Sequence, residues 1–344
     1  MGIYGNVDIT IQRHLPPCHM LSGLRRSAFT VAMEKSAAEA IWESASHMGF
    51  VDPTPSIAGA VIVAPKEGQK APKELHLLDQ SSFRQLMLAA RGVAKTVIKK
   101  SSDVQRCALV ADCASRGFLH AAVLPLAGVG KDWSQVLAHE EEFHEGYPGY
   151  VTSKNGPRAE DQELEDIQDK LISASGSTRS PKSHPDKRFD GDPADSNLFA
   201  RLVRGELQQW RIWEDEHAVA FLTPFPSTPG FAVVVPRSHL SSDVLGLEEE
   251  DDYLRLMDAS RTVGLRLVTA LGARSFAVVC EGYEIDYAHV KVIPIHKSTV
   301  TNRAEVVGET AKTYSGFVHS MPGQKVDDEY LKRWMDCYTA KKTV

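Results

Sequence analysis

The sequence of 344 residues is poor in cysteine, in long apolar runs and in excess positive charge. Its five cysteines are odd in number and none shows Cys-x-x-Cys spacing, so we expect reduced thiols in an intracellular, cytoplasmic protein. No run approaches the roughly 18 apolar residues that a membrane-spanning helix needs, which argues against a membrane partner. The formal charge of −6 offers no basic surface for phosphates, which argues against duplex nucleic acid as a partner.

One pattern occurs twice along the chain. Residues 55–65 and 226–236 both read Pro-Ser-x-x-Gly, then five residues of strand character, then Pro, at an offset of 171. Apolar spacing typical of a helix face follows at residues 83–97 and 253–267. A strand with one central histidine comes later in each copy. Because the order is kept while the offset drifts slowly, we interpret the pattern as a duplication with small loop deletions.

The duplication predicts two units of α+β class. We place the first at residues 22–173 and the second at 197–344, with a linker at 174–196 that contains little apolar surface. Each unit has strands, one long helix and strands again, and the hairpin-like spacing predicts an antiparallel sheet.

Ionisable side chains that could act in catalysis or phosphate binding lie in the later part of the second copy. Alternation along its last strand places Tyr287, His289 and Lys291 on one face and apolar residues on the other. Upstream, Arg237 and His239 follow another apolar strand. The sequence therefore predicts a row of polar side chains with a cation and a second imidazole nearby.

The order of motifs in the second copy resembles a known family. The series reads Leu-Phe-Ala-Arg-Leu-Val-Arg-Gly-Glu from residue 198, Trp-Glu-Asp from 213, Ala-Phe-Leu-Thr-Pro from 220, Pro-Gly from 229, Val-Pro-Arg-Ser-His from 235 and His-Val-Lys-Val-Ile-Pro from 289. Over residues 197–296 it resembles a histidine-triad (HIT) protein from end to end. The first copy then resembles a degenerate HIT unit. The resemblance implies that the two tandem units pair as an intramolecular pseudo-dimer; whether the chain dimerises further is left open.

The resemblance also implies a site for a nucleotide or a related phosphate ester. In the family, the middle histidine attacks the α-phosphorus and forms a nucleotidyl-imidazole, which water or another acceptor resolves. That position is His289, and neutral imidazole is a competent nucleophile near pH 7. The implied substrates are dinucleoside polyphosphates or nucleoside phosphoramidates, and the implied activity is hydrolysis or nucleotidyl transfer.

Specific residues follow from the same resemblance. Lys291 is expected to neutralise phosphate oxygens, and His239 to hold a distal phosphate or protonate the leaving group. Tyr287 completes the catalytic candidates. We expect no metal or cofactor, because His139 and His144, at i and i+5 on an expected helix, would point about 140° apart. The residues expected to bind substrate are Leu198, Phe199, Leu202, Phe221, Thr223, Arg237, Cys280 and His296.

Some positions depart from the family pattern. Tyr287 replaces the first histidine, and a phenol that titrates near 10 cannot relay a proton as imidazole does. Thr223 replaces an aspartate that binds ribose, and Cys280 replaces an asparagine. In the first copy His120 lacks charged neighbours, so we expect a structural half-site there. Two functions stay open: a nucleotidyl hydrolase or transferase, and a catalytically weak or dead HIT-fold module that binds a nucleotide or a protein.

Overall fold

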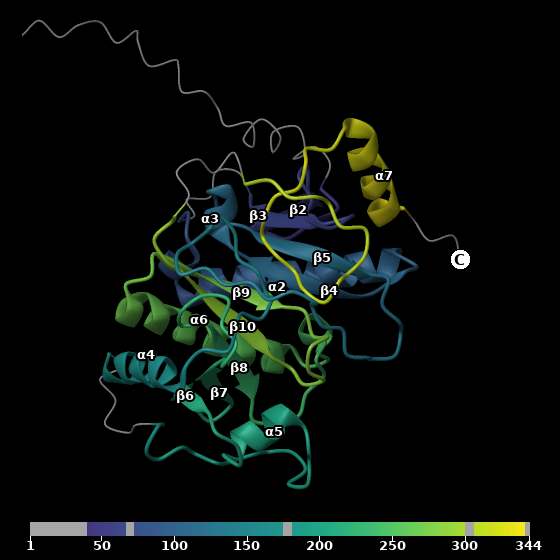
Figure 1. The fold of residues 1–344 in the computed structure, drawn as a ribbon. Helices are drawn as coiled ribbons and strands as arrows, with labels where there is room; N and C mark the ends of the chain where they lie inside the picture. Colours follow the sequence, from purple (N-terminus) through teal and green to yellow (C-terminus); the bar gives the residue numbers. More distant parts are fainter. Residues whose placement is uncertain (1–39, 67–71, 175–180, 300–305, 341–344) are drawn as a thin grey trace, which may run out of the picture. The chain divides into compact units, whose positions relative to one another are not determined.

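An antiparallel sheet organises both copies of the repeat (Figure 1). In the computed structural model, the described residues are 40–66, 72–174, 181–299 and 306–340. Within them, ten strands hydrogen-bond in the order β1-β2-β3-β5-β4-β9-β10-β8-β7-β6. The strands are β1 Trp42–Glu43, β2 His47–Val51, β3 Val61–Pro65, β4 Val104–Ala111, β5 Ala121–Ala127, β6 Trp210–Glu214, β7 Ala218–Leu222, β8 Ala232–Pro236, β9 Ser275–Cys280 and β10 Val290–Ile295.

The strand order repeats from each edge of the sheet to its centre. From one edge it runs β1-β2-β3-β5-β4, and from the other β6-β7-β8-β10-β9, so the two copies fold alike. They meet where β4 pairs antiparallel with β9, with Leu109 opposite Cys280 and Val110 opposite Val279. The α+β class with an antiparallel sheet, expected from the duplication, is confirmed.

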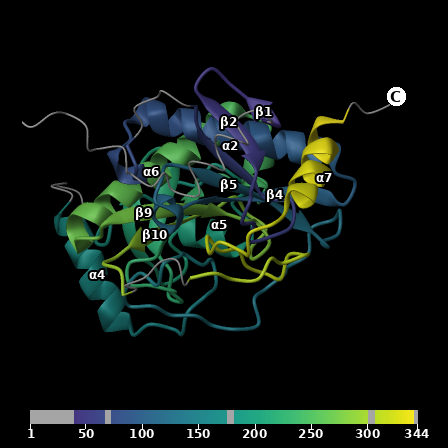
Figure 2. The same cartoon turned by 90° about the horizontal axis from the view of Figure 1, so that it is seen from above.

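Two long helices pack on the sheet, and Figure 2 shows both along one side of it. The apolar stripes expected at residues 83–97 and 253–267 are buried in α2 and α6, and the hydroxyl of Ser260 donates to the carbonyl of Leu256. The predicted helices are therefore confirmed. The helices are α2 Gln80–Lys100, α3 Cys113–Arg116, α4 Asp161–Ser173, α5 Leu198–Val203, α6 Glu250–Leu271 and α7 Asp328–Thr339, with 3₁₀ turns η2 Leu75–Leu77 and η3 Val244–Gly246.

The segment that follows the last strand of the first copy packs on the second copy. We call residues 128–174 the first tail. Its Gly156 and Ala159 donate main-chain hydrogen bonds to the carbonyls of Phe225 and Pro224. Its helix α4 packs against β6 and α6.

The second tail, residues 306–340, makes the reciprocal contacts with the first copy. Gly323 donates to the carbonyl of Thr54 and Val326 to that of Pro53, each at 3.0 Å. Helix α7 packs against α2 and β2 (yellow in Figure 1). Each copy therefore supplies a tail that completes the other copy.

Some expectations concern single residues or segments. Cys107, Cys113, Cys280 and Cys337 are free thiols, whereas Cys18, residues 22–39 of the first unit and residues 175–180 of the linker lie outside the described residues. Residues 139–144 form an irregular loop, so the helix expected there is wrong.

Within the described ranges, no helix combines the length and apolar character needed to cross a bilayer.

Candidate functional site

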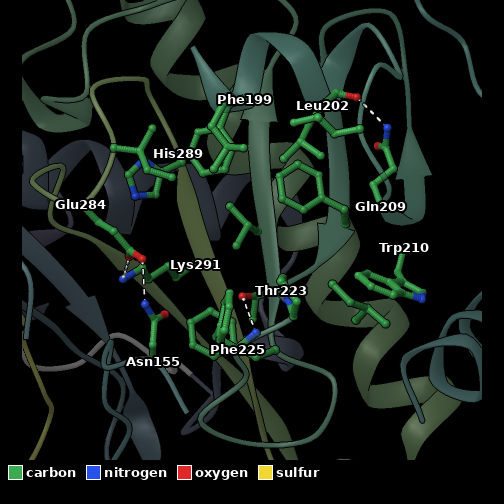
Figure 3. Close-up of a pocket in the computed structure, with 18 of the residues that line it drawn as sticks. Asn155, Phe199, Leu202, Gln209, Trp210, Thr223, Phe225, Glu284, His289 and Lys291 are labelled. Carbon is green, nitrogen blue, oxygen red and sulfur yellow. Dashed lines mark hydrogen bonds and ion pairs between the residues drawn. The ribbon is translucent and has the colours of Figure 1, made fainter. Parts of the chain in front are cut away.

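A cavity of about 360 Å³ opens in the second copy (Figure 3). Its wall comes from α5, β6, β7, β8, the segment before β10, β10 itself and Asn155 of the first tail, and it is mainly apolar. Helix α5 begins at an Asn197 cap whose side chain accepts a hydrogen bond from the backbone of Phe199. Seven residues expected at the site line the cavity: Leu198, Phe199, Leu202, Phe221, Thr223, His289 and Lys291.

His289 presents one ring nitrogen for chemistry. Its Nδ1 lies 2.7 Å from the carbonyl oxygen of Tyr287, which can only accept, so Nδ1 carries the proton. Nε2 then holds a lone pair, and among the described residues nothing hydrogen-bonds to it. Burial, and then the nearby charge of Lys291, lower the pKa of His289 below its usual value. The ring is therefore a neutral imidazole at physiological pH.

Lys291 is held by three acceptors. Its ammonium donates to Glu281 at 2.6 Å, to Glu284 at 2.9 Å and to the carbonyl of Ser153 at 2.9 Å. Burial alone would lower the pKa of Lys291, but the two carboxylates outweigh it and raise the pKa. An ammonium has three donors, so every donor of this cation is engaged within the protein.

No sequence motif indicated the carboxylates around Lys291. Glu281 also accepts from the hydroxyl of Tyr314 at 2.9 Å, and Glu284 accepts from the side-chain amide of Asn155 at 2.9 Å. The charge of Lys291 lowers the pKa of Glu284 to about 2. Two carboxyl groups thus face one ammonium.

Tyr287 and His239 stack on each other outside the cavity wall, with ring centroids 4.7 Å apart. The hydroxyl of Tyr287 donates to the carbonyl of Pro236, and burial raises the pKa of this phenol. Both nitrogens of His239 lie 2.7 Å from an acceptor, one on Asp195 and one on the main chain of Asp286. Neither residue is among those that line the cavity.

Three residues expected to bind substrate lie elsewhere. Arg237 is buried and donates to main-chain carbonyls of the segment before α5 and of the β6–β7 turn, so it fixes the chain there. Cys280 belongs to the apolar core, and burial raises the pKa of its thiol. His296 contacts the carbonyl of Pro229 at 2.8 Å. Trp210, Phe225 and other aromatic or amide residues, which no motif had indicated, also line the cavity.

The equivalent position in the first copy has different surroundings. His120 is 1% exposed, its Nδ1 lies 3.0 Å from the carbonyl of Phe118, and its ring stacks on the Phe118 ring. Burial, with a smaller effect of Arg116, lowers the pKa of His120 to about 3. The position of Lys291 is taken by Ala122, so no cation follows this histidine on the strand.

Comparison with known proteins gives relatives of the size of one copy. No family model matches the chain. It is 31% identical over 149 residues to "Protein hit" of Bacillus subtilis, which covers 41% of this chain and 95% of that protein. An uncharacterized HIT-like protein of Mycoplasma pneumoniae is 27% identical over 110 residues, covering 29% and 72% of the two chains.

The solved structures give a broader and weaker likeness. A uridylyltransferase structure covers 86% of this chain and 86% of its own, at 12% identity and a TM-score of 0.45. A hypothetical histidine triad nucleotide-binding protein of Sulfolobus tokodaii covers 41% of this chain and 88% of its own, at 20% identity and a TM-score of 0.27.

Proposed function

The chain belongs to the histidine-triad (HIT) superfamily, and we propose that its second copy binds a nucleotide or a related phosphate ester and cleaves or transfers it through His289. One observation carries this proposal. A neutral imidazole, fixed by its Nδ1 proton to a main-chain carbonyl, borders an apolar cavity with its Nε2 lone pair unused. This is the protonation state that a nucleophilic imidazole needs.

The cavity suggests how such a ligand is held. Phe199, Leu202 and Phe221 offer an apolar slot suited to a base, and Thr223 adds a hydroxyl at its edge. The phosphorus would then lie beside Nε2 of His289.

The chemical step divides one displacement into two. Nε2 donates its lone pair to phosphorus while the bond from phosphorus to the leaving group breaks. The leaving group keeps that electron pair and takes a proton from solvent. Water, or another hydroxyl or amine acceptor, next attacks phosphorus. The phosphorus–nitrogen bond breaks, its electron pair returns to Nε2, and the acceptor releases a proton.

Groups around His289 act on this intermediate in both directions. A ring that carries phosphorus on Nε2 and a proton on Nδ1 is a cation. Burial and the charge of Lys291 disfavour positive charge on this ring, whereas the carbonyl of Tyr287 and the carboxylates of Glu284 and Glu281 favour it and offset part of that cost. The carbonyl of Tyr287, 2.7 Å from Nδ1, is therefore already in place to stabilise charge that develops on the ring.

We also propose the unit boundaries at residues 22–173 and 197–344, with residues 174–196 between them. Pairing of β4 with β9 and the reciprocal contacts of the two tails support an internal pseudo-dimer of these units. In this arrangement the first copy serves the site of the second through its tail.

A second function is favoured by a specific observation. All donors of Lys291 are engaged, and among the described residues of the cavity wall no other cation is present. A site that neutralises phosphate charge so weakly suits a nucleotide-binding module with little or no turnover. The two functions share the same pocket and differ only in the fate of the bound ligand.

The test compares His289→Asn with His120→Asn. Both remove a buried histidine that directly precedes one of two equivalent strands, β10 and β5, but only the first changes the cavity wall. Wild type and the His120 variant should release product from an aryl-amine nucleoside phosphoramidate. The His289 variant should lose at least about 100-fold in rate, as for loss of a nucleophile. Mass spectrometry after an alkaline quench should find the nucleotidyl group on the His289 peptide of wild type.

Two other results decide between the candidates. Equal and slow release by all three proteins, with tight nucleotide binding, would leave the binding module as the function. Absence of nucleotide binding by wild type in calorimetry would overturn both.

A further inference from the structure

The charge of the cavity wall is unusual for a site that receives a phosphate. Phosphate groups normally bind to cations that still have hydrogen-bond donors available. Here Lys291 is surrounded by Glu281, Glu284 and the carbonyl of Ser153, all within 2.9 Å of its nitrogen. The cation is therefore neutralised before any ligand arrives.

Of the two carboxylates, Glu284 is the one that faces the ligand space. Its side chain is 24% exposed and lines the cavity, whereas that of Glu281 is 1% exposed and lies behind Lys291. Figure 3 shows Glu284 at the cavity edge below His289, joined to Lys291 and to Asn155. The amide of Asn155, from the first tail, restrains this carboxylate in place.

A second negative group on the ligand would meet this carboxylate at close range. In a partly buried site, like charges a few ångströms apart repel much more strongly than they do in water. A single phosphorus centre can take its place beside His289, but an adjoining phosphate chain finds no available cation in the described wall.

We propose that Glu284 is a specificity-determining residue, which restricts the pocket to nucleoside phosphate esters or amides with one charged phosphorus centre and disfavours di- and triphosphate chains. This inference rests on the proposed nucleotide site and narrows its substrate class. Phosphoramidates and phosphodiesters then suit the pocket, while dinucleoside polyphosphates do not.

Calorimetry with wild type and two variants tests the assignment. The probes are the 5′-mono-, di- and triphosphates of whichever nucleoside binds, from adenosine, guanosine, cytidine and uridine. Wild type should bind the monophosphate most tightly. Glu284→Gln keeps the size of the side chain and removes its charge, so it should improve triphosphate affinity relative to monophosphate by roughly tenfold, the effect of one charge in a partly buried site. Glu216→Gln removes a charge from an exposed side chain outside the cavity wall and should leave the ratio unchanged.

The wild-type measurement alone can overturn the inference, so the test does not require the Glu284→Gln variant to fold. Triphosphate binding by wild type as tight as monophosphate binding would contradict it. An unchanged ratio in a folded Glu284→Gln protein would do the same. If no nucleotide binds wild type at all, the proposed function itself fails. That result differs from the two outcomes that contradict only the role of Glu284.

Discussion

His120 and His289 are equivalent residues with the same backbone contact. Each directs Nδ1 at the carbonyl two residues earlier, that of Phe118 or Tyr287, and burial lowers the pKa of both rings. His289 has Lys291 and a cavity beside it, while His120 stacks on an aromatic ring. The expectation that His120 lacks charged neighbours is wrong, because Arg116 lies close enough to lower its pKa. We therefore expect the first histidine of the pair to matter for stability and the second for the site.

The stability role of His120 gives a pH prediction. Its pKa is about 3 in the folded chain and near 6.5 in the unfolded chain. Between these values only the unfolded chain binds the proton, so this group lowers the free energy of unfolding by up to about 1.4 kcal/mol per pH unit as pH falls. His120→Asn removes this contribution. Between pH 7 and pH 5 the variant should lose about 2 kcal/mol less than wild type in urea titrations. Parallel losses in both proteins would contradict the burial argument.

At the scale of elements, the two tails can be tested with a matched pair of glycines. A Cβ on Gly156 would meet the carbonyl oxygen of Pro226, and one on Gly323 would meet that of Pro55, at equivalent places. Either Ala variant should lose about 1–3 kcal/mol of stability through overpacking against backbone. Only Gly156→Ala disturbs the segment next to Phe225, which lines the cavity, so only this variant should also weaken nucleotide binding.

Unfolding titrations and calorimetry on both glycine variants provide the measurement. Loss of nucleotide affinity in Gly323→Ala equal to that in Gly156→Ala would mean that the first tail has no special relation to the pocket. Stability unchanged in both would contradict the close packing of the tails.

The sequence predicts the elements better than it predicts the contacts between them. The stripes of α2 and α6 are local patterns, because periodicity and burial act over neighbouring residues. The strand expected from Tyr287 onward begins only at Val290, so its predicted start was wrong. Ser153 and Asn155 could not be found in this way, since they reach Lys291 and Glu284 from 138 and 129 residues away. Arg237 and Cys280 were expected at the site from motif position alone, yet the first binds main-chain carbonyls and the second faces the core.

At the scale of the whole molecule, the two copies share both a sheet and a core. β4 and β9 form its central pair, and one apolar cluster contains residues of both long helices, including Leu86 and Leu256. Helices α2 and α6 also contact each other, and each tail packs on the opposite copy. Separation of the copies would therefore expose strand edges and apolar surface in both.

This shared core predicts that both copies unfold in one transition. Leu86 in α2 and Leu256 in α6 are equivalent and fully buried, so replacing either by Ala should cost about 2–5 kcal/mol. Hydrogen exchange during urea titration, followed on peptides from β2 and from β7, should give one midpoint for both strands in wild type. Each variant should lower the two midpoints together, although its cavity lies in one copy. A variant in which β2 loses protection while β7 keeps it would show that the copies fold independently, and the first copy would then be no structural support for the site.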